Sequence, residues 1–352
     1  GDTVGYRIRG ESKVGKATRI EVVTEGILTR MLQSDPGLTG IGVLIFDEFH
    51  ERSLNADLGL ALAWEARGAL REDLVLIVMS ATLDADPVAD LLDGAPVLRS
   101  QGRAFPVETR WLDAPLRKEV RFETAVAGLV EKAVSETEGG LLVFLPGEGE
   151  IRRVASAMSL PPHCHVHMLF GAMEMKAQRA AIRPAREGRK VVLATAIAET
   201  SLTIEDVRVV VDAGRARRAR FDRGSGMSRL VTERVSKAEA EQRRGRAGRV
   251  AEGTCYRMWT KGEEGALPAF APPEIEVADL APLALELALW GAGDGEGLAF
   301  LTPPNPGVLD EARALLTDLG ALHGGHITDH GKALARLPLH PRLGHMLTIA
   351  GR

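Results

Sequence analysis

The chain has 352 residues, of which 45% are hydrophobic and 26% charged, and its formal net charge is −4. This composition is ample for the cores of two to three domains, and no apolar run approaches the roughly 20 residues of a membrane span. The two cysteines, Cys164 and Cys255, argue against a disulfide framework and favour a reducing, cytoplasmic location.

A phosphate-loop-like pattern occurs at residues 10–17, which match the first seven positions of G-x-x-x-x-G-K-[ST]. Ala17 stands where the pattern requires the hydroxyl that binds Mg²⁺. The next residues, 18–23, favour a β-strand, whereas a phosphate-binding loop opens a helix. We therefore interpret the segment as a chance match and expect the true loop to lie upstream of this chain.

An apolar run at residues 43–46 is followed directly by Asp47 and Glu48. This pattern is typical of a buried parallel strand that ends at its carboxyl edge, where open α/β sheets bind ligands. Asp47 and Glu48 there can hold Mg²⁺ through water, and Glu48 can also orient and deprotonate an attacking water.

Two further apolar strands end in polar residues. The first, 74–79, is followed by Ser80 and Thr82, and the second, 190–194, by Thr195. Either one alone could be a core strand with a polar cap. The acids after residue 46 precede them and an arginine-rich segment at 242–249 follows, and all four elements in this order are not explained by core strands alone.

The segment 242–249 has the sequence Q-R-R-G-R-A-G-R, with four arginines in eight residues. Arginine presents a fixed fork of donors, so this spacing suits several phosphate oxygens at once, although a solvated basic helix face is the alternative. Residues 212–249 contain twelve Lys/Arg and five Asp/Glu, a local net charge of +7. Such a concentration is expected of a surface that follows a nucleic-acid backbone.

Residues 163–167, H-C-H-V-H, have side chains that suit zinc. Strand alternation, however, puts the three histidines on one face and Cys164 on the other. No second group of ligands completes a tetrahedral site, so we favour an ordinary strand.

These motifs resemble those of a superfamily 2 helicase of the DEAH/RHA group: D-E-F-H (47–50, motif II), S-A-T (80–82, motif III), A-T-A-I-A-E-T-S-L-T-I (194–204, motif V) and Q-R-R-G-R-A-G-R (242–249, motif VI). The longer string D-E-F-H-E-R-S-L is similar to the bacterial HrpB-type ATP-dependent helicases. So are the segments 255–259, 279–291 and 337–347.

The resemblance implies an α/β fold with two RecA-like domains followed by a small helical and winged-helix domain. We expect domain 1 at 1–103 without its P-loop segment, domain 2 at 104–262, and at 263–352 a helical linker, a winged helix and the start of a helical bundle. Domain 2 should have strands near 108–112, 141–145, 165–169, 190–195 and 207–212. A helix at 307–319 and a β turn-back at 321–328 fit the winged helix. Both ends suggest a fragment of a longer protein.

The resemblance also implies roles in the use of ATP and Mg²⁺. Gln242 would place the attacking water, Arg246 and Arg249 would act as arginine fingers, and His50 would couple the two domains rather than bind metal. Ser80 and Thr82 would couple hydrolysis to movement. Residues near the nucleotide would be Thr203 and Glu205 at the ribose and Ile182 at the base, although Ile182 equally suits the core.

Nucleic-acid contacts implied by the resemblance are Thr24 and Arg30 (motif Ib), Gly147 (motif IV), Thr195, and the arginines of a hairpin, Arg215, Arg217, Arg218 and Arg220. A hairpin that is merely solvated is the alternative. Ala196 stands where the family usually has asparagine, which removes one donor to the strand.

The expected function is an ATP-dependent helicase that moves 3′ to 5′ on single-stranded RNA, as a monomer and without a membrane. A DNA translocase of the same superfamily and a non-catalytic RNA-binding scaffold are the alternatives. Without the P-loop, the chain alone is expected to be inactive.

Overall fold

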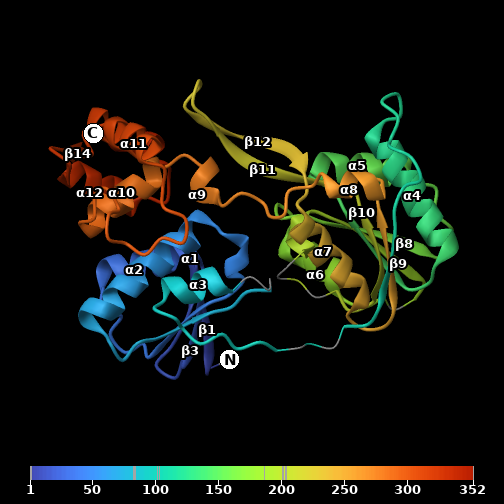
Figure 1. The fold of residues 1–352 in the computed structure, drawn as a ribbon, viewed down its shortest axis with the longest axis horizontal. Helices are drawn as coiled ribbons and strands as arrows, with labels where there is room; N and C mark the ends of the chain where they lie inside the picture. Colours follow the sequence, from blue (N-terminus) through green and yellow to red (C-terminus); the bar gives the residue numbers. More distant parts are fainter. Residues whose placement is uncertain are drawn as a thin grey trace. The chain divides into compact units, whose positions relative to one another are not determined.

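The structure, a computed structural model, describes residues 2–81, 85–100, 102, 104–185, 187–199, 202 and 204–351. The chain forms two compact units (Figure 1). Unit 1 comprises Gly1–Leu98, Arg220–Ser228 and Pro272–Arg352, and unit 2 comprises Arg99–Ala219 and Arg229–Ala271.

Unit 2 is built on a parallel sheet with the strand order β6-β13-β10-β7-β9-β8. Its strands are β6 (Val107–Arg110), β7 (Gly140–Phe144), β8 (Cys164–Leu169), β9 (Arg189–Ala194), β10 (Val207–Asp212) and β13 (Gly253–Arg257). The five predicted strands are confirmed, and β13 is an additional one. The central strands are apolar on both faces because helices cover both sides of a parallel sheet.

The helices of unit 2 cover two apolar clusters, and strand alternation separates these clusters onto opposite faces of the sheet. Leu141 and Val143 of β7 belong to one cluster, and Leu142 and Phe144 belong to the other. The helices are α4 (Phe122–Glu136), α5 (Glu148–Ala157), α6 (Met175–Ile182), α7 (Lys237–Gly245) and α8 (Lys261–Gly265), with the short 3₁₀ helices η2 (Ala196–Ala198) and η3 (Arg246–Gly248).

Unit 1 contains two small sheets, one with the order β2-β1-β3 and one in which β4 and β5 run parallel. Its N-terminal elements are β1 (Val4–Ile8), β2 (Glu11–Lys13), β3 (Ile20–Val23), α1 (Glu25–Ser34), β4 (Val43–Phe46), η1 (Phe49–Glu51), α2 (Leu54–Leu70), β5 (Val75–Val78) and α3 (Asp86–Leu91). The strands predicted at 43–46 and 74–79 are thus confirmed as parallel strands. The predicted burial of the first is wrong, because one face of β4 leaves Val43 and Ile45 exposed.

The C-terminal part of unit 1 shares one apolar core with these elements, since Leu28 and Leu60 belong to the same cluster as Leu283 and Leu316. It consists of α9 (Glu274–Val277), α10 (Ala281–Trp290), α11 (Pro306–Asp318), β14 (Leu322–His323), β15 (His326–Ile327), α12 (Asp329–Arg336) and α13 (Pro341–Ala350). The predicted helix at 307–319 and the antiparallel β turn-back after it are confirmed as α11 and β14–β15.

A two-stranded hairpin of β11 (Arg215–Asp222) and β12 (Met227–Arg234) carries the arginine run. The hairpin projects as a long ribbon in Figure 1. Among the described residues, no helix is both long and apolar enough to cross a membrane.

Candidate functional site

Asp47 and Glu48 lie at the carboxyl end of β4, as predicted. Glu48 is in the left-handed region with φ 52°, and its backbone N–H donates to Asp47 Oδ1 over 2.9 Å. The ends of β4 and β5 are joined here, because Met79 N–H donates to Phe46 O over 2.8 Å. A non-glycine residue with this φ is strained by about 1 kcal/mol or more, which is found where a loop must present a side chain.

His50 connects this loop to the segment after β5. Its side chain is 7% exposed, its Nδ1 accepts a hydrogen bond from the Ala81 N–H over 3.2 Å, and its Nε2 lies 3.5 Å from Glu48 Oε2. Motifs II and III are therefore in direct contact within unit 1. Of the two predicted coupling residues, Ser80 is exposed next to this contact, and Thr82 lies outside the described residues.

The donor chemistry of the acidic pair fits Mg²⁺. Asp47 is exposed and Glu48 half-buried, and carboxylate oxygens with water are the ligands that Mg²⁺ prefers. His50 is poorly suited to bind a metal, because Nδ1 accepts a backbone N–H and the hydrogen of the neutral ring is then on Nε2. Within the described part of the chain, no group of three or more His, Cys, Asp or Glu side chains could hold a metal ion.

Arg52 and Asp57 fix the chain directly after motif II, a role that the sequence did not reveal. The Arg52 guanidinium makes two bonds of 3.0 Å to the buried Asp57 carboxylate and one of 2.9 Å to Thr302 Oγ1. The Glu274 N–H donates to Arg52 O over 3.1 Å. Burial raises the pKa of Asp57, and the Arg52 bonds oppose this effect. The signal in the sequence is Asp57, the one charged residue in the first ten residues of α2.

The match to a phosphate-loop pattern at 10–17 falls in a β-hairpin. Strands β1 and β2 pair antiparallel around Gly10, whose φ is +80°, and the next element is the strand β3. The interpretation as a chance match is therefore confirmed, because a phosphate-binding loop would lead into a helix.

In unit 2, motifs V and VI meet through a buried arginine that was not singled out beforehand. Arg243 is 1% exposed, with Nε 2.9 Å from Glu199 Oε2 and Nη1 2.9 Å from Asp212 Oδ1. Its guanidinium also stacks 5.0 Å from the centre of the Phe144 ring. Burial raises the pKa of Glu199, and the Arg243 charge opposes this shift. Removal of Arg243 or of its carboxylate partners would leave a buried charge without its counter-charge, which is strongly destabilising. These ion pairs therefore hold α7 against the sheet.

The two predicted arginine fingers lie in different surroundings. Arg246 is 5% exposed and directs its guanidinium at backbone carbonyls of motif V, with Nε 2.8 Å from Glu199 O and Nη1 2.6 Å from Leu202 O. Arg249 is exposed, and Gln242 is half-buried. In this arrangement Arg246 therefore supports motif V, and contact with a phosphate would require it to exchange these acceptors.

The predicted nucleotide-side residues are only partly described. Ile182 is half-buried at the end of α6 and packs against the apolar cluster that includes Phe144, which agrees with the core alternative. Glu205 is exposed. Thr203 lies outside the described residues.

Three predicted strand contacts each directly precede a helix. Thr24 precedes α1, Gly147 precedes α5 and Thr195 precedes η2, and neither threonine hydroxyl caps its own helix. Helix N-termini offer unpaired backbone N–H groups and a favourable dipole to anions such as phosphates. The N-termini of α1 and α5 each offer such a position, although Gly147 itself is buried and η2 has only three residues.

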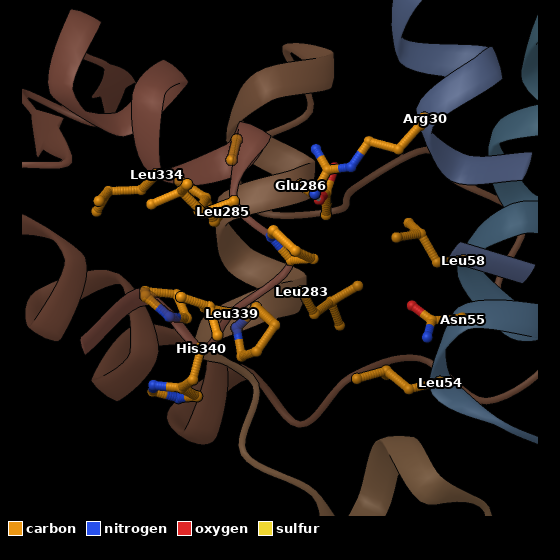
Figure 2. Close-up of a pocket in the computed structure, with 15 residues that line it drawn as sticks. Arg30, Leu54, Asn55, Leu58, Leu283, Leu285, Glu286, Leu334, Leu339 and His340 are labelled. Atoms are coloured by element: carbon orange, nitrogen blue, oxygen red, sulfur yellow. Dashed lines mark ion pairs between the residues drawn. The ribbon is translucent and has the colours of Figure 1, made fainter. Parts of the chain in front are cut away.

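Arg30, a predicted strand contact, faces the C-terminal part of unit 1. Its Nη2 lies 3.1 Å from Glu286 Oε1, and Gln33 Nε2 donates to the same carboxylate over 3.1 Å. Figure 2 shows Arg30 and Glu286 next to each other at a pocket that several leucines also line. The pocket has a volume of about 320 Å³. Burial raises the pKa of Glu286, and the Arg30 charge opposes this shift. Part of the Arg30 charge is thus neutralised within the unit.

The hairpin arginines alternate as expected, with Arg215 and Arg217 exposed and Arg218 and Arg220 half-buried. Arg217 Nη2 lies 3.1 Å from Glu150 Oε1, and its guanidinium lies so close to Gly147 that a Cβ there would collide with it. Arg215 stacks 4.0 Å from the centre of the Phe122 ring. Motif IV and the hairpin are therefore adjacent within unit 2.

Comparison with known proteins places these motifs in context. The helicase conserved C-terminal domain matches residues 125–251. The chain is 49% identical to the ATP-dependent RNA helicase HrpB of Escherichia coli (strain K12), over 99% of the chain and 43% of that protein. It is 34% identical to the ATP-dependent RNA helicase HrpA of the same organism, over 99% of the chain and 28% of that protein.

The crystal structure of the Escherichia coli DEAH/RHA helicase HrpB resembles the chain with a TM-score of 0.93 and 48% identity. This match covers 99% of the chain and 44% of that structure. A second crystal structure, of the E. coli DExH-box NTPase HrpB, gives a TM-score of 0.89 over 98% of the chain and 43% of that structure. The chain spans less than half the length of each of these relatives.

Proposed function

We propose that the chain belongs to the HrpB-type group of the DEAH/RHA helicases, which its 49% identity to HrpB supports. On this proposal it forms part of an ATP-dependent helicase that acts on single-stranded RNA. On this proposal, the strands of both units are parts of RecA-like domains, the first of them incomplete, and the α11–β15 segment is a winged helix. Movement is 3′ to 5′, driven by hydrolysis of ATP with Mg²⁺.

The observation that carries the proposal is the contact among Glu48, His50 and Ala81 at the carboxyl edge of β4 and β5. An acidic pair held at the end of parallel strands is suited to bind Mg²⁺ through water and to deprotonate an attacking water. The histidine contact connects that pair to a second loop, so a change in the state of one loop is transmitted to the other. On this proposal Gln242 places the attacking water, and Arg246 and Arg249 stabilise the charge that develops on the phosphate.

RNA is the proposed strand because the curated relatives HrpB and HrpA are named RNA helicases. Thr24, Thr195 and the segment at Gly147 would bind phosphates through helix N-termini, and exposed Arg215 and Arg217 would add charge. Arg30 and the half-buried Arg220 remain candidates for the same strand. Phosphate contacts do not read a 2′-hydroxyl, so the DNA translocase remains the alternative.

We further propose that these 352 residues alone do not hydrolyse ATP at a useful rate. The sequence contains no complete G-x-x-x-x-G-K-[ST] pattern, and its nearest match lies in the β1–β2 hairpin. The pattern supplies the phosphate cradle, the lysine and the Mg²⁺ hydroxyl. RNA-stimulated phosphate release by the purified 352-residue chain would contradict this and would direct attention to Lys16.

The test of the function uses the full-length gene product. Phosphate release should be measured without nucleic acid, with single-stranded RNA and with single-stranded DNA of the same sequence, and unwinding should be followed on duplexes with 3′ and 5′ overhangs. Stimulation by RNA and unwinding from the 3′ overhang are expected. Stimulation by DNA alone would support the translocase, and RNA binding without any hydrolysis would support the scaffold.

A further inference from the structure

We propose that Arg218 is a positioning residue that joins the β11–β12 hairpin to helix α7, and that it does not grip the strand. This inference rests on the proposed function, since motif VI begins within α7, at Gln242. It separates Arg218 from Arg217, its neighbour on the opposite face of the same strand, and gives the two arginines different tasks.

The surroundings of Arg218 leave it poorly placed to meet a phosphate. Its side chain is 17% exposed, compared with 32% for Arg217. Nη1 lies 3.4 Å from both Glu233 Oε2 and the Arg234 carbonyl oxygen, and Nη2 donates to Glu239 Oε1. The guanidinium thus binds acceptors on the partner strand β12 and on helix α7.

Glu239 is the residue through which Arg218 acts on α7. It is the N3 residue of a capping box whose N-cap is Ser236. Its Oε2 accepts the Ser236 N–H over 2.7 Å and the Ser236 hydroxyl over 2.8 Å. One oxygen of the carboxylate therefore fixes the start of the helix, and the other holds the hairpin. Burial alone would raise the pKa of Glu239, but the Ser236 bonds and the Arg218 charge outweigh it and lower the pKa.

A second bond joins the hairpin to α7 one turn further on. Arg243 Nη1, which holds Asp212, also lies 3.4 Å from the Arg215 carbonyl oxygen at the start of β11. The base of the hairpin is thus bonded to α7 at two points. Because charged hydrogen bonds are directional and strong away from water, movement of the hairpin by a bound strand would be transmitted to α7. Gln242 and the arginines that follow it would then shift.

Variants of the full-length gene product test this inference. They are Arg218→Ala, Arg218→Lys, Arg217→Ala, Glu239→Gln, the double variant Arg218→Ala/Glu239→Gln and, as the matched control, Arg229→Ala. Arg229 is an exposed arginine on β12. The measurements are the Kd for a labelled RNA oligonucleotide at several salt concentrations, and kcat for ATP with saturating RNA.

Arg218→Ala should lower kcat at saturating RNA at least 5-fold while the Kd and its salt slope stay within 2-fold of wild type. Arg217→Ala should instead raise the Kd and flatten the log–log salt slope by about 0.7. Arg218→Lys should give an intermediate kcat, because an ammonium keeps the charge but not the planar fork. Glu239→Gln should share the defect, and combining it with Arg218→Ala should add little, as for residues that act through one contact.

A flattened salt slope for Arg218→Ala, or a kcat equal to that of Arg229→Ala, would overturn the inference. If wild type shows no RNA-stimulated hydrolysis, the proposed function fails by itself. The positioning role is then decided by hydrogen exchange in the 352-residue chain. Faster exchange of the first amides of α7 in Arg218→Ala than in Arg229→Ala supports it, and equal exchange in these two variants contradicts it.

Discussion

His50 accepts the backbone N–H of Ala81 at Nδ1 over 3.2 Å, which fixes the orientation and the tautomer of its imidazole. Because Nδ1 is the acceptor, the hydrogen of the neutral ring lies on Nε2, the atom 3.5 Å from Glu48 Oε2. The loop after β5 thereby controls the side chain that faces the proposed general base. A movement of either loop would therefore change the position of the side chains in the other.

Replacing His50 with alanine should therefore lower ATP hydrolysis by the full-length protein by roughly 10-fold or more, as for other groups that orient a ligating carboxylate. ATP affinity should change little, because the acids remain. The matched control is His326→Ala, an exposed histidine on β15. Steady-state kinetics that leave kcat unchanged in His50→Ala would show that the contact with Ala81 has no part in hydrolysis.

The two proposed arginine fingers should differ in their effect on stability. Arg249→Ala should lower hydrolysis on the order of 10³-fold by loss of charge stabilisation, with an unchanged melting temperature, since Arg249 is exposed. Arg246→Ala should lower the rate of hydrolysis and also the melting temperature, because it leaves the carbonyl oxygens of Glu199 and Leu202 without their donor. Thermal unfolding and single-turnover kinetics on the same samples check this. Equal melting temperatures for the two variants would contradict the supporting role of Arg246.

The double variant Arg215→Ala/Arg217→Ala should weaken RNA binding by a similar factor for every sequence, since phosphate interactions position without specifying. The log–log salt slope should fall by about 0.7 for every phosphate that the variant no longer binds. The measurement is oligonucleotide binding between low and physiological salt. An unchanged slope would identify the exposed face of the hairpin as merely solvated, and Thr24 and Thr195 would then be the residues to test.

The capping box gives a pH dependence of stability. Glu239 has a lowered pKa in the folded chain. Its contribution is therefore fully present above the unfolded glutamate value of about 4.3 and is lost as the pH falls through the lower, folded pKa. The Glu239→Gln variant should melt about 2–4 °C below wild type at pH 7, which corresponds to a loss of roughly 1 kcal/mol in the free energy of unfolding. The difference should shrink progressively below pH ~4.3. A difference in melting temperature that does not change with pH would contradict the stabilising role of the Glu239 charge.

The parallel strands were the most predictable part of the fold. Strand β7 is buried on both faces and its sequence is continuously apolar, and β10 contains an uninterrupted run of three buried valines, so both were readily predicted. Strand β13 was not predicted because its sequence, G-T-C-Y-R, has no apolar run. It joins the sheet through its pairing with β10 and β6, and that pairing depends on tertiary structure.

For the candidate site, the sequence motifs predicted which loops carry the functional residues. The hydrogen-bond and ion-pair partners of those residues became known only from the structure. Arg30 pairs with Glu286, which is 256 positions away in the sequence, and no local pattern announces that pairing. Arg243 and Arg246 are both in the arginine motif, yet both are buried against motif V. Charge patterns show that arginines will bind acceptors, but they do not distinguish a phosphate from a carboxylate or a carbonyl of the same chain.

The most direct test of the proposed mechanism is RNA-dependent phosphate release by the full-length protein with and without Glu48→Gln. Glutamine keeps the size and much of the hydrogen bonding of Glu48 but cannot take a proton from water. Wild type should hydrolyse ATP faster with RNA, and the variant should bind ATP with similar affinity while its hydrolysis falls by about 10²-fold or more. Near-normal hydrolysis by Glu48→Gln, or a wild type that RNA does not stimulate, would contradict the mechanism.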